Sequence, residues 1–89
     1  MASKNNGFGQ RPSQAAQSFS VDELVGRRVQ QRRTALNIPI DELARTIGIT
    51  PMQLEAFESG KVRFDPQLLA DIAKILGVSA AWFFIRTDD

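Results

Sequence analysis

The sequence has no cysteine and no histidine among its 89 residues. Without cysteine, the chain can form no disulfide, no thiol nucleophile and no zinc site with cysteine ligands. Without histidine, it also lacks the commonest metal ligand and the commonest general base of enzymes. A phosphate-binding loop and a cofactor motif are missing as well. These absences predict a protein that is not an enzyme and that uses no metal and no cofactor.

Long hydrophobic runs are also absent. The longest uninterrupted apolar run, Ala80 to Ile85, has six residues, whereas a membrane span needs about 20. The first twenty residues contain no apolar stretch of the kind found in secretory signals. We therefore expect a cytoplasmic protein with no membrane partner.

The composition is that of one small globular domain, with 43% hydrophobic and 24% charged residues and a formal net charge of +1. Residues 1–19 differ from the rest, because they are rich in Gly, Asn, Gln and Ser and carry only Lys4 and Arg11 as charges. Such a segment cannot bury enough apolar surface to offset its chain entropy. We expect it to be a disordered tail, either a basic arm that touches DNA or a partner, or a solvated leader.

Local signals predict five helices after this tail. Ser20-Val21-Asp22-Glu23 has the pattern of a capping box, and Thr50-Pro51-Met52-Gln53 has the same pattern with proline at the first helical position. Apolar periodicity, together with Pro, Asp, Ser and Gly at the boundaries, places the helices at about residues 21–36, 40–47, 50–59, 65–77 and 79–85. The predicted class is all-α, a compact bundle over about residues 20–86, followed by a C-terminal tail at 87–89.

The segment of about residues 40–59 has the spacing of a helix-turn-helix. Counted from Ile40, apolar residues stand at the fourth, eighth, tenth, fifteenth and eighteenth places, with Ala44 at the fifth and Gly48 at the ninth. Two helices that cross through a three- or four-residue turn need a small side chain where they approach and a residue that tolerates positive φ in the turn. All seven positions in register indicate such a crossing.

The sequence resembles the lambda-repressor-like helix-turn-helix regulators of the Cro/CI type (XRE family) from Val25 to about Phe84. The matching motifs are Gly26-Arg27-Arg28-Val29, Asp41-Glu42-Leu43-Ala44, Phe57-Glu58-Ser59-Gly60-Lys61, Leu76-Gly77-Val78-Ser79 and Trp82-Phe83-Phe84. The resemblance implies a five-helix fold that binds specific duplex DNA, usually as a dimer on a palindromic operator, and that regulates transcription, most often by repression.

In such proteins the second helix of the motif lies in the major groove and its side chains read base edges. The resemblance implies base contacts from Pro51, Met52, Gln53 and Ala56. Gln53 is the one bidentate donor and acceptor among them and suits adenine, whereas the other three can make apolar contacts with thymine methyl groups. The alternative is a surface that makes no hydrogen bonds to bases.

Phosphate contacts are expected from Thr50, Ser59, Lys61, Arg63 and Arg45, with Arg27, Arg28 or Arg32 as further candidates. For each basic residue the alternative is a solvated surface charge. A contact that the family often makes at the start of its second helix is lost, because Pro39 and Ile40 stand there. The segment 40–59 also carries one basic residue against four acidic ones, a net charge of −3, which is a weak electrostatic footprint for a DNA-binding face.

Two further roles concern the fold and its assembly. The resemblance implies an internal ion pair between Arg33 and Glu58. Trp82, Phe83, Phe84 and Ile85 are four consecutive large apolar residues, and one helix of a small bundle cannot turn all of them inward. We expect Phe84 and Ile85 to supply the interface of a symmetric homodimer.

A rival interpretation is a helix-turn-helix scaffold used as a protein-binding module, for instance as an anti-activator or an antitoxin. Pro51 and Met52 exposed on an acidic helix suit a groove on a protein partner better than a phosphate backbone. The two interpretations differ in salt-dependent binding to duplex DNA, which only the first requires.

Overall fold

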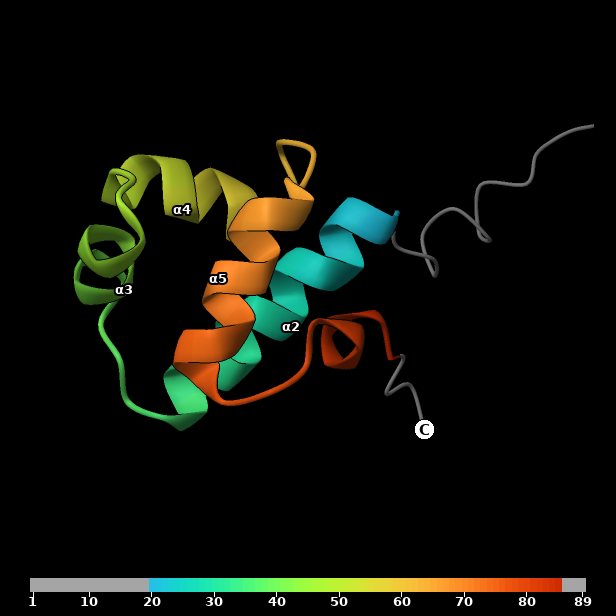
Figure 1. Cartoon of the computed structure of the whole chain (residues 1–89). Coiled ribbons are helices and arrows are strands. Elements are labelled where there is room, and N and C mark those ends of the chain that lie inside the picture. Colours follow the sequence, from blue (N-terminus) through green and yellow to red (C-terminus); the bar gives the residue numbers. More distant parts are fainter. Residues whose placement is uncertain (1–19, 86–89) are drawn as a thin grey trace, which may run out of the picture.

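The computed structural model describes residues 20–85, which form an all-helical fold with no strand among them (Figure 1). In chain order the elements are α2 (Val21–Ala35), α3 (Ile40–Ile47), α4 (Pro51–Glu58), α5 (Pro66–Leu76) and the 3-10 helix η1 (Ala80–Phe84). The predicted tails at 1–19 and 87–89 lie outside the described residues. The predicted all-α class is confirmed over the described part of the chain.

The last predicted helix is a 3-10 helix of five residues. The amide of Trp82 donates to the carbonyl of Ser79 (3.0 Å), and the amide of Ile85 donates to that of Trp82 (3.3 Å). Both bonds span three residues, which is the 3-10 pattern that short connecting pieces adopt. Ile85 is already extended, so the helical segment ends at Phe84.

The starts of α2 and α4 are closed by the two capping boxes that the sequence predicts. The hydroxyl of Ser20 accepts from the amide of Glu23 (3.1 Å), and the Glu23 carboxylate accepts from the amide of Ser20 (3.0 Å). Thr50 and Gln53 form the same reciprocal pair at the start of α4. These bonds satisfy amide groups that the helices themselves leave without partners.

The hydrophobic core draws on every helical element. Its largest fully buried side chains are Phe83, Leu43, Leu54, Leu69, Ile72, Leu76, Val25 and Val29. Helix α2 packs against α4, α5 and η1, while α3 packs against α4 and α5. Figure 1 shows α3 and α4 together at one end of the bundle, with η1 beside α2 at the other.

The backbones of α2 and α4 meet at Gly26. A Cβ atom added to Gly26 would overlap the backbone carbonyl oxygens of Phe57 and Glu58 at the end of α4. Only a residue without a side chain allows this approach, which sets how closely α4 lies against α2.

Two arginines of α2 hold the C-terminal part of the domain. Arg28 donates through Nε (3.3 Å) and Nη2 (3.0 Å) to the backbone carbonyl of Trp82, and its guanidinium lies 3.6 Å from the centre of the Trp82 ring system. Arg32 donates through Nε to the carbonyl of Leu76 at the end of α5 (2.9 Å). Both side chains are engaged within the fold, which argues against the expectation that Arg28 or Arg32 contacts phosphate.

Candidate nucleic-acid interface

The turn between α3 and α4 has the geometry that the spacing predicts. Gly48 ends α3 with a φ of 84°, in the left-handed region that favours glycine. The amide of Ile49 donates to the carbonyl of Ala44 (3.0 Å), and Thr50 then caps α4. Leu43 and Ala44 on α3, and Leu54 and Phe57 on α4, are buried between the helices and the rest of the core. The two helices therefore form one rigid unit.

The outer face of α4 carries the four residues expected to contact bases. Pro51, Met52 and Gln53 are exposed, and Ala56 is half-buried. Met52 has 77% of its surface accessible, the largest value among the exposed large hydrophobic residues of the described chain. This face presents apolar groups and one amide.

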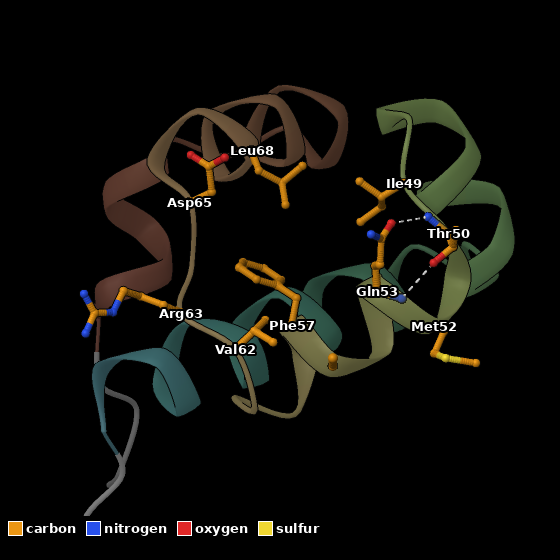
Figure 2. A pocket seen from close by; sticks show the side chains of 10 residues that line it. Ile49, Thr50, Met52, Gln53, Phe57, Val62, Arg63, Asp65 and Leu68 are labelled. Atoms are coloured by element: carbon orange, nitrogen blue, oxygen red, sulfur yellow. Dashed lines mark hydrogen bonds between the residues drawn. The ribbon is translucent and has the colours of Figure 1, made fainter.

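Gln53 takes part in the cap of α4. Its backbone amide donates to the hydroxyl of Thr50 (3.0 Å), and its side-chain oxygen Oε1 accepts from the backbone amide of Thr50 (2.9 Å). Figure 2 shows both bonds, with the amide group of Gln53 turned back toward the start of the helix. The residue with the strongest expected role in base recognition therefore also has a structural role.

An open groove of about 460 Å³ lies beside α4, between this helix, the loop that follows it and the start of α5. Figure 2 shows the side chains of Ile49, Phe57 and Leu68 directed into it, whereas Met52 and Arg63 point away. Val62 and Asp65 also contribute to its lining. Sequence reasoning did not predict this groove, because its walls come from the α3–α4 turn, from α4, from the loop after it and from the start of α5, which only the tertiary fold brings together.

The basic residues near α4 lie mainly in the loop after it. Lys61 and Arg63 are exposed, and the loop is fixed by the amide of Lys61 donating to the carbonyl of Ala56 (3.0 Å) and by the amide of Phe64 donating to the carboxylate of Asp22 (2.9 Å). These bonds fix the backbone of the loop that carries the two cations.

The other expected phosphate contacts have partners within the protein. Ser59 donates its hydroxyl to the carbonyl of Ala56 (3.1 Å), and Thr50 accepts the capping bond from Gln53. Arg45 is an exposed side chain 3.8 Å from the carboxylate of Asp41, one turn earlier in α3. Exposed pairs of this kind are weak, so a stronger anion can replace the carboxylate.

Arg33 and Glu58 form a buried ion pair that joins α2 to the end of α4. Arg33 donates through Nε (2.6 Å) and Nη2 (2.9 Å) to the two carboxylate oxygens, and through Nη1 to the carbonyl of Ile38 (2.9 Å). The hydrogen bonds that Arg33 donates to Glu58 raise the pKa of Arg33 above its ordinary value, so the guanidinium remains charged. One side chain thus connects the first helix, the loop before α3 and the last turn of α4.

The closing segment divides its four apolar residues between the core and the surface. Phe83 is fully buried, and Trp82 is half-buried against the guanidinium of Arg28. Phe84 and Ile85 are 42% and 52% exposed, and Phe84 lies edge-on to Phe64 with 5.5 Å between the ring centres. The two residues expected at a dimer interface are the two that the fold leaves at the surface.

The periodicity of α2 contained a signal for the structural arginines. Arg28 and Arg32 are four residues apart and stand beside the core positions Val25 and Val29 on the helix. This spacing places both arginines at the edge of the buried face.

Within residues 20–85, none of the helices is long and apolar enough to cross a membrane.

Comparison with known proteins gives consistent matches. The family model described as Helix-turn-helix matches residues 29–83. A Rhodospirillum rubrum protein described as an uncharacterized transcriptional regulator in the ATPase CF(0) region is 47% identical over 64 residues, which are 72% of this chain and 59% of that protein. An uncharacterized HTH-type transcriptional regulator of Sinorhizobium medicae is 36% identical over 64 residues, covering 72% and 46% of the two chains.

The fold also matches a solved regulator. The crystal structure of the clp gene regulator ClgR from Corynebacterium glutamicum superimposes with a TM-score of 0.71 at 26% identity, over 74% of this chain and 86% of the other. The chain belongs to this helix-turn-helix family, which confirms the resemblance to Cro/CI-type (XRE) regulators. It spans about half the length of the curated relatives it matches.

Proposed function

We propose that this protein is a cytoplasmic DNA-binding transcriptional regulator, acting as a repressor, that places α4 in the major groove of its operator. The observation that supports this most directly is the α3–turn–α4 unit. Its second helix exposes one face, and the loop after that face carries Lys61 and Arg63. A helix with a free face enters the major groove of B-DNA, while cations beside it neutralise phosphates.

The proposed contacts divide into two groups. Pro51, Met52, Gln53 and Ala56 face base edges, with Met52 positioned for apolar contact with a thymine methyl group. Phosphate contacts come from Lys61 and Arg63 in the loop, from Arg45, and from the polar groups of Thr50 and Ser59. Few basic side chains are available for this purpose, because Arg28, Arg32 and Arg33 are bonded within the fold.

We further propose that the protein acts as a symmetric homodimer joined through Phe84 and Ile85. Exposed apolar side chains that lie together mark association surfaces. A two-fold axis through this surface relates two copies of α4, and recognition helices about 34–36 Å apart read successive turns of one palindromic site.

Selection of duplexes from a random pool by the purified protein tests this function. The expected result is a palindromic consensus, whose affinity falls steeply as salt rises because phosphate binding releases counterions. No enrichment, together with no salt-dependent binding to bulk duplex DNA, would reject DNA binding.

That negative result would favour the protein-binding alternative, an anti-activator or antitoxin. Two observations give it weight: the net charge of −3 over residues 40–59 and the high exposure of Met52. An acidic helix with an exposed methionine fits an apolar groove on another protein better than it fits a polyanion.

A further inference from the structure

The amide of Gln53 has a fixed orientation. The backbone amide of Thr50 can only donate, so the group 2.9 Å from it must be the side-chain oxygen of Gln53. The NH2 group is consequently the other branch of the planar amide, and it is turned toward the groove beside α4 (Figure 2). Gln53 is exposed, so this donor is accessible from outside.

This orientation does not allow the pairing expected from the residue type. Glutamine recognises adenine with two bonds, its oxygen accepting from N6 while its nitrogen donates to N7, which requires both atoms to face the base together. In this protein the oxygen faces the backbone of Thr50. An amide that turned outward to pair with adenine would leave the amide of Thr50 without its capping partner.

We propose that Gln53 reads its base as a hydrogen-bond donor only, and so selects guanine and rejects cytosine at the base that it contacts. The inference rests on the proposed DNA-binding function. Guanine presents two acceptors in the major groove, O6 and N7, whereas cytosine presents only the N4 donor. Adenine and thymine each offer one acceptor in the major groove, so their affinities rank between those of guanine and cytosine.

The neighbours of Gln53 on α4 allow its base preference to be measured separately. Pro51, Met52 and Ala56, the other expected base contacts, have no polar side-chain atoms. The bond from the backbone amide of Thr50 also holds the side-chain amide of Gln53 before DNA arrives, so little side-chain freedom is lost when DNA binds. Discrimination by hydrogen bonding at this base pair therefore depends on one donor.

The substitution Gln53→Glu separates the cap from the donor. Glutamate is the usual partner in a capping box, so its carboxylate can still accept from the amide of Thr50. It has no donor, however, and its second oxygen is an acceptor that suits cytosine N4. Gln53→Ala removes the side-chain half of the cap together with the donor. Glu55→Gln is a matched control on the same helix that changes a charge outside the cap.

The experiment measures the affinity of the parent chain and the three variants for a selected operator. Each of the four bases is placed in turn at the base pair that Gln53 contacts. We expect the parent to prefer guanine over cytosine by about 5-fold, the lower end of the range for a bidentate pair, because only the donor group of Gln53 faces the base. Gln53→Glu should invert the preference, Gln53→Ala should abolish it, and Glu55→Gln should leave it unchanged. The ratio between bases is used because an added carboxylate weakens binding to every sequence alike.

Hydrogen exchange of the Thr50 amide in the free protein tests the cap without DNA. Protection in the parent and in Gln53→Glu, and its loss in Gln53→Ala, is the expected pattern. A parent that prefers adenine, or a Gln53→Glu variant with the parent's preference, overturns the inference while DNA binding stands. A parent that binds no duplex above random sequence overturns the proposed function and the inference with it.

Discussion

Removal of Glu58 should destabilise this domain more than removal of Glu55, the other charged residue of α4. The side chain of Glu58 is 5% exposed, and its carboxylate accepts two bonds, of 2.6 and 2.9 Å, from the guanidinium of Arg33, whose side chain is 10% exposed. In Glu58→Ala, Arg33 stays in place with only the carbonyl of Ile38 as a partner. The variant therefore contains a buried charge that nothing neutralises.

The expected loss is large for a protein of this size. Breaking a buried ion pair by removing one partner costs about 3–5 kcal/mol, against a total stability of about 5–15 kcal/mol for ordinary domains. For a small domain, each 1 kcal/mol lowers Tm by about 4–8 °C, so Tm should fall by at least about 12 °C.

Thermal and urea unfolding followed by circular dichroism measure the effect, with Glu55→Ala as the control. Glu55 lies on the same helix and has the same charge, but it is exposed, so its replacement should change the stability by less than about 0.5 kcal/mol. The paired variant Arg33→Met/Glu58→Leu should regain much of the loss, because no buried charge remains. Equal melting temperatures for the two alanine variants would refute the reasoning.

Three other substitutions test the packing, the phosphate contacts and the assembly. Gly26→Ala should destabilise the domain by more than Gly48→Ala, although alanine favours helices, because the added methyl group meets the backbone of α4. Gly48 has open space around it, so its replacement incurs only the left-handed strain of about 1–2 kcal/mol. Chemical unfolding of both variants measures the difference. Lys61→Ala should weaken binding to specific and random duplexes alike, and it should reduce the slope of log affinity against log salt concentration by about one. Lys74→Ala on α5 is the control. A loss of affinity confined to the operator would contradict a phosphate contact. Phe84→Glu should give a folded monomer that binds a palindrome much more weakly, as sedimentation and titration would show; an unchanged dimer places the interface elsewhere.

The sequence alone was sufficient to predict the family and the four α-helices of the described residues, while the last predicted helix is a 3-10 helix. Capping boxes at Ser20 and Thr50, prolines at the first helical positions and Gly48 act within a few residues of themselves. Signals of this kind do not depend on the rest of the fold. The apolar periodicity then fixes which face of each helix is buried, and the register of residues 40–59 follows from it.

Only the tertiary structure decided what individual polar and aromatic side chains do. Arg28 bonds to the carbonyl of Trp82, 54 residues away in the sequence, so it could be read as a phosphate contact until the packing of η1 on α2 was known. The same packing buries Phe83 and leaves Phe84 exposed, although the two are chemically identical neighbours. The role of a side chain is set by the groups that packing brings within a few ångströms of it, and for these residues the groups come from distant parts of the chain.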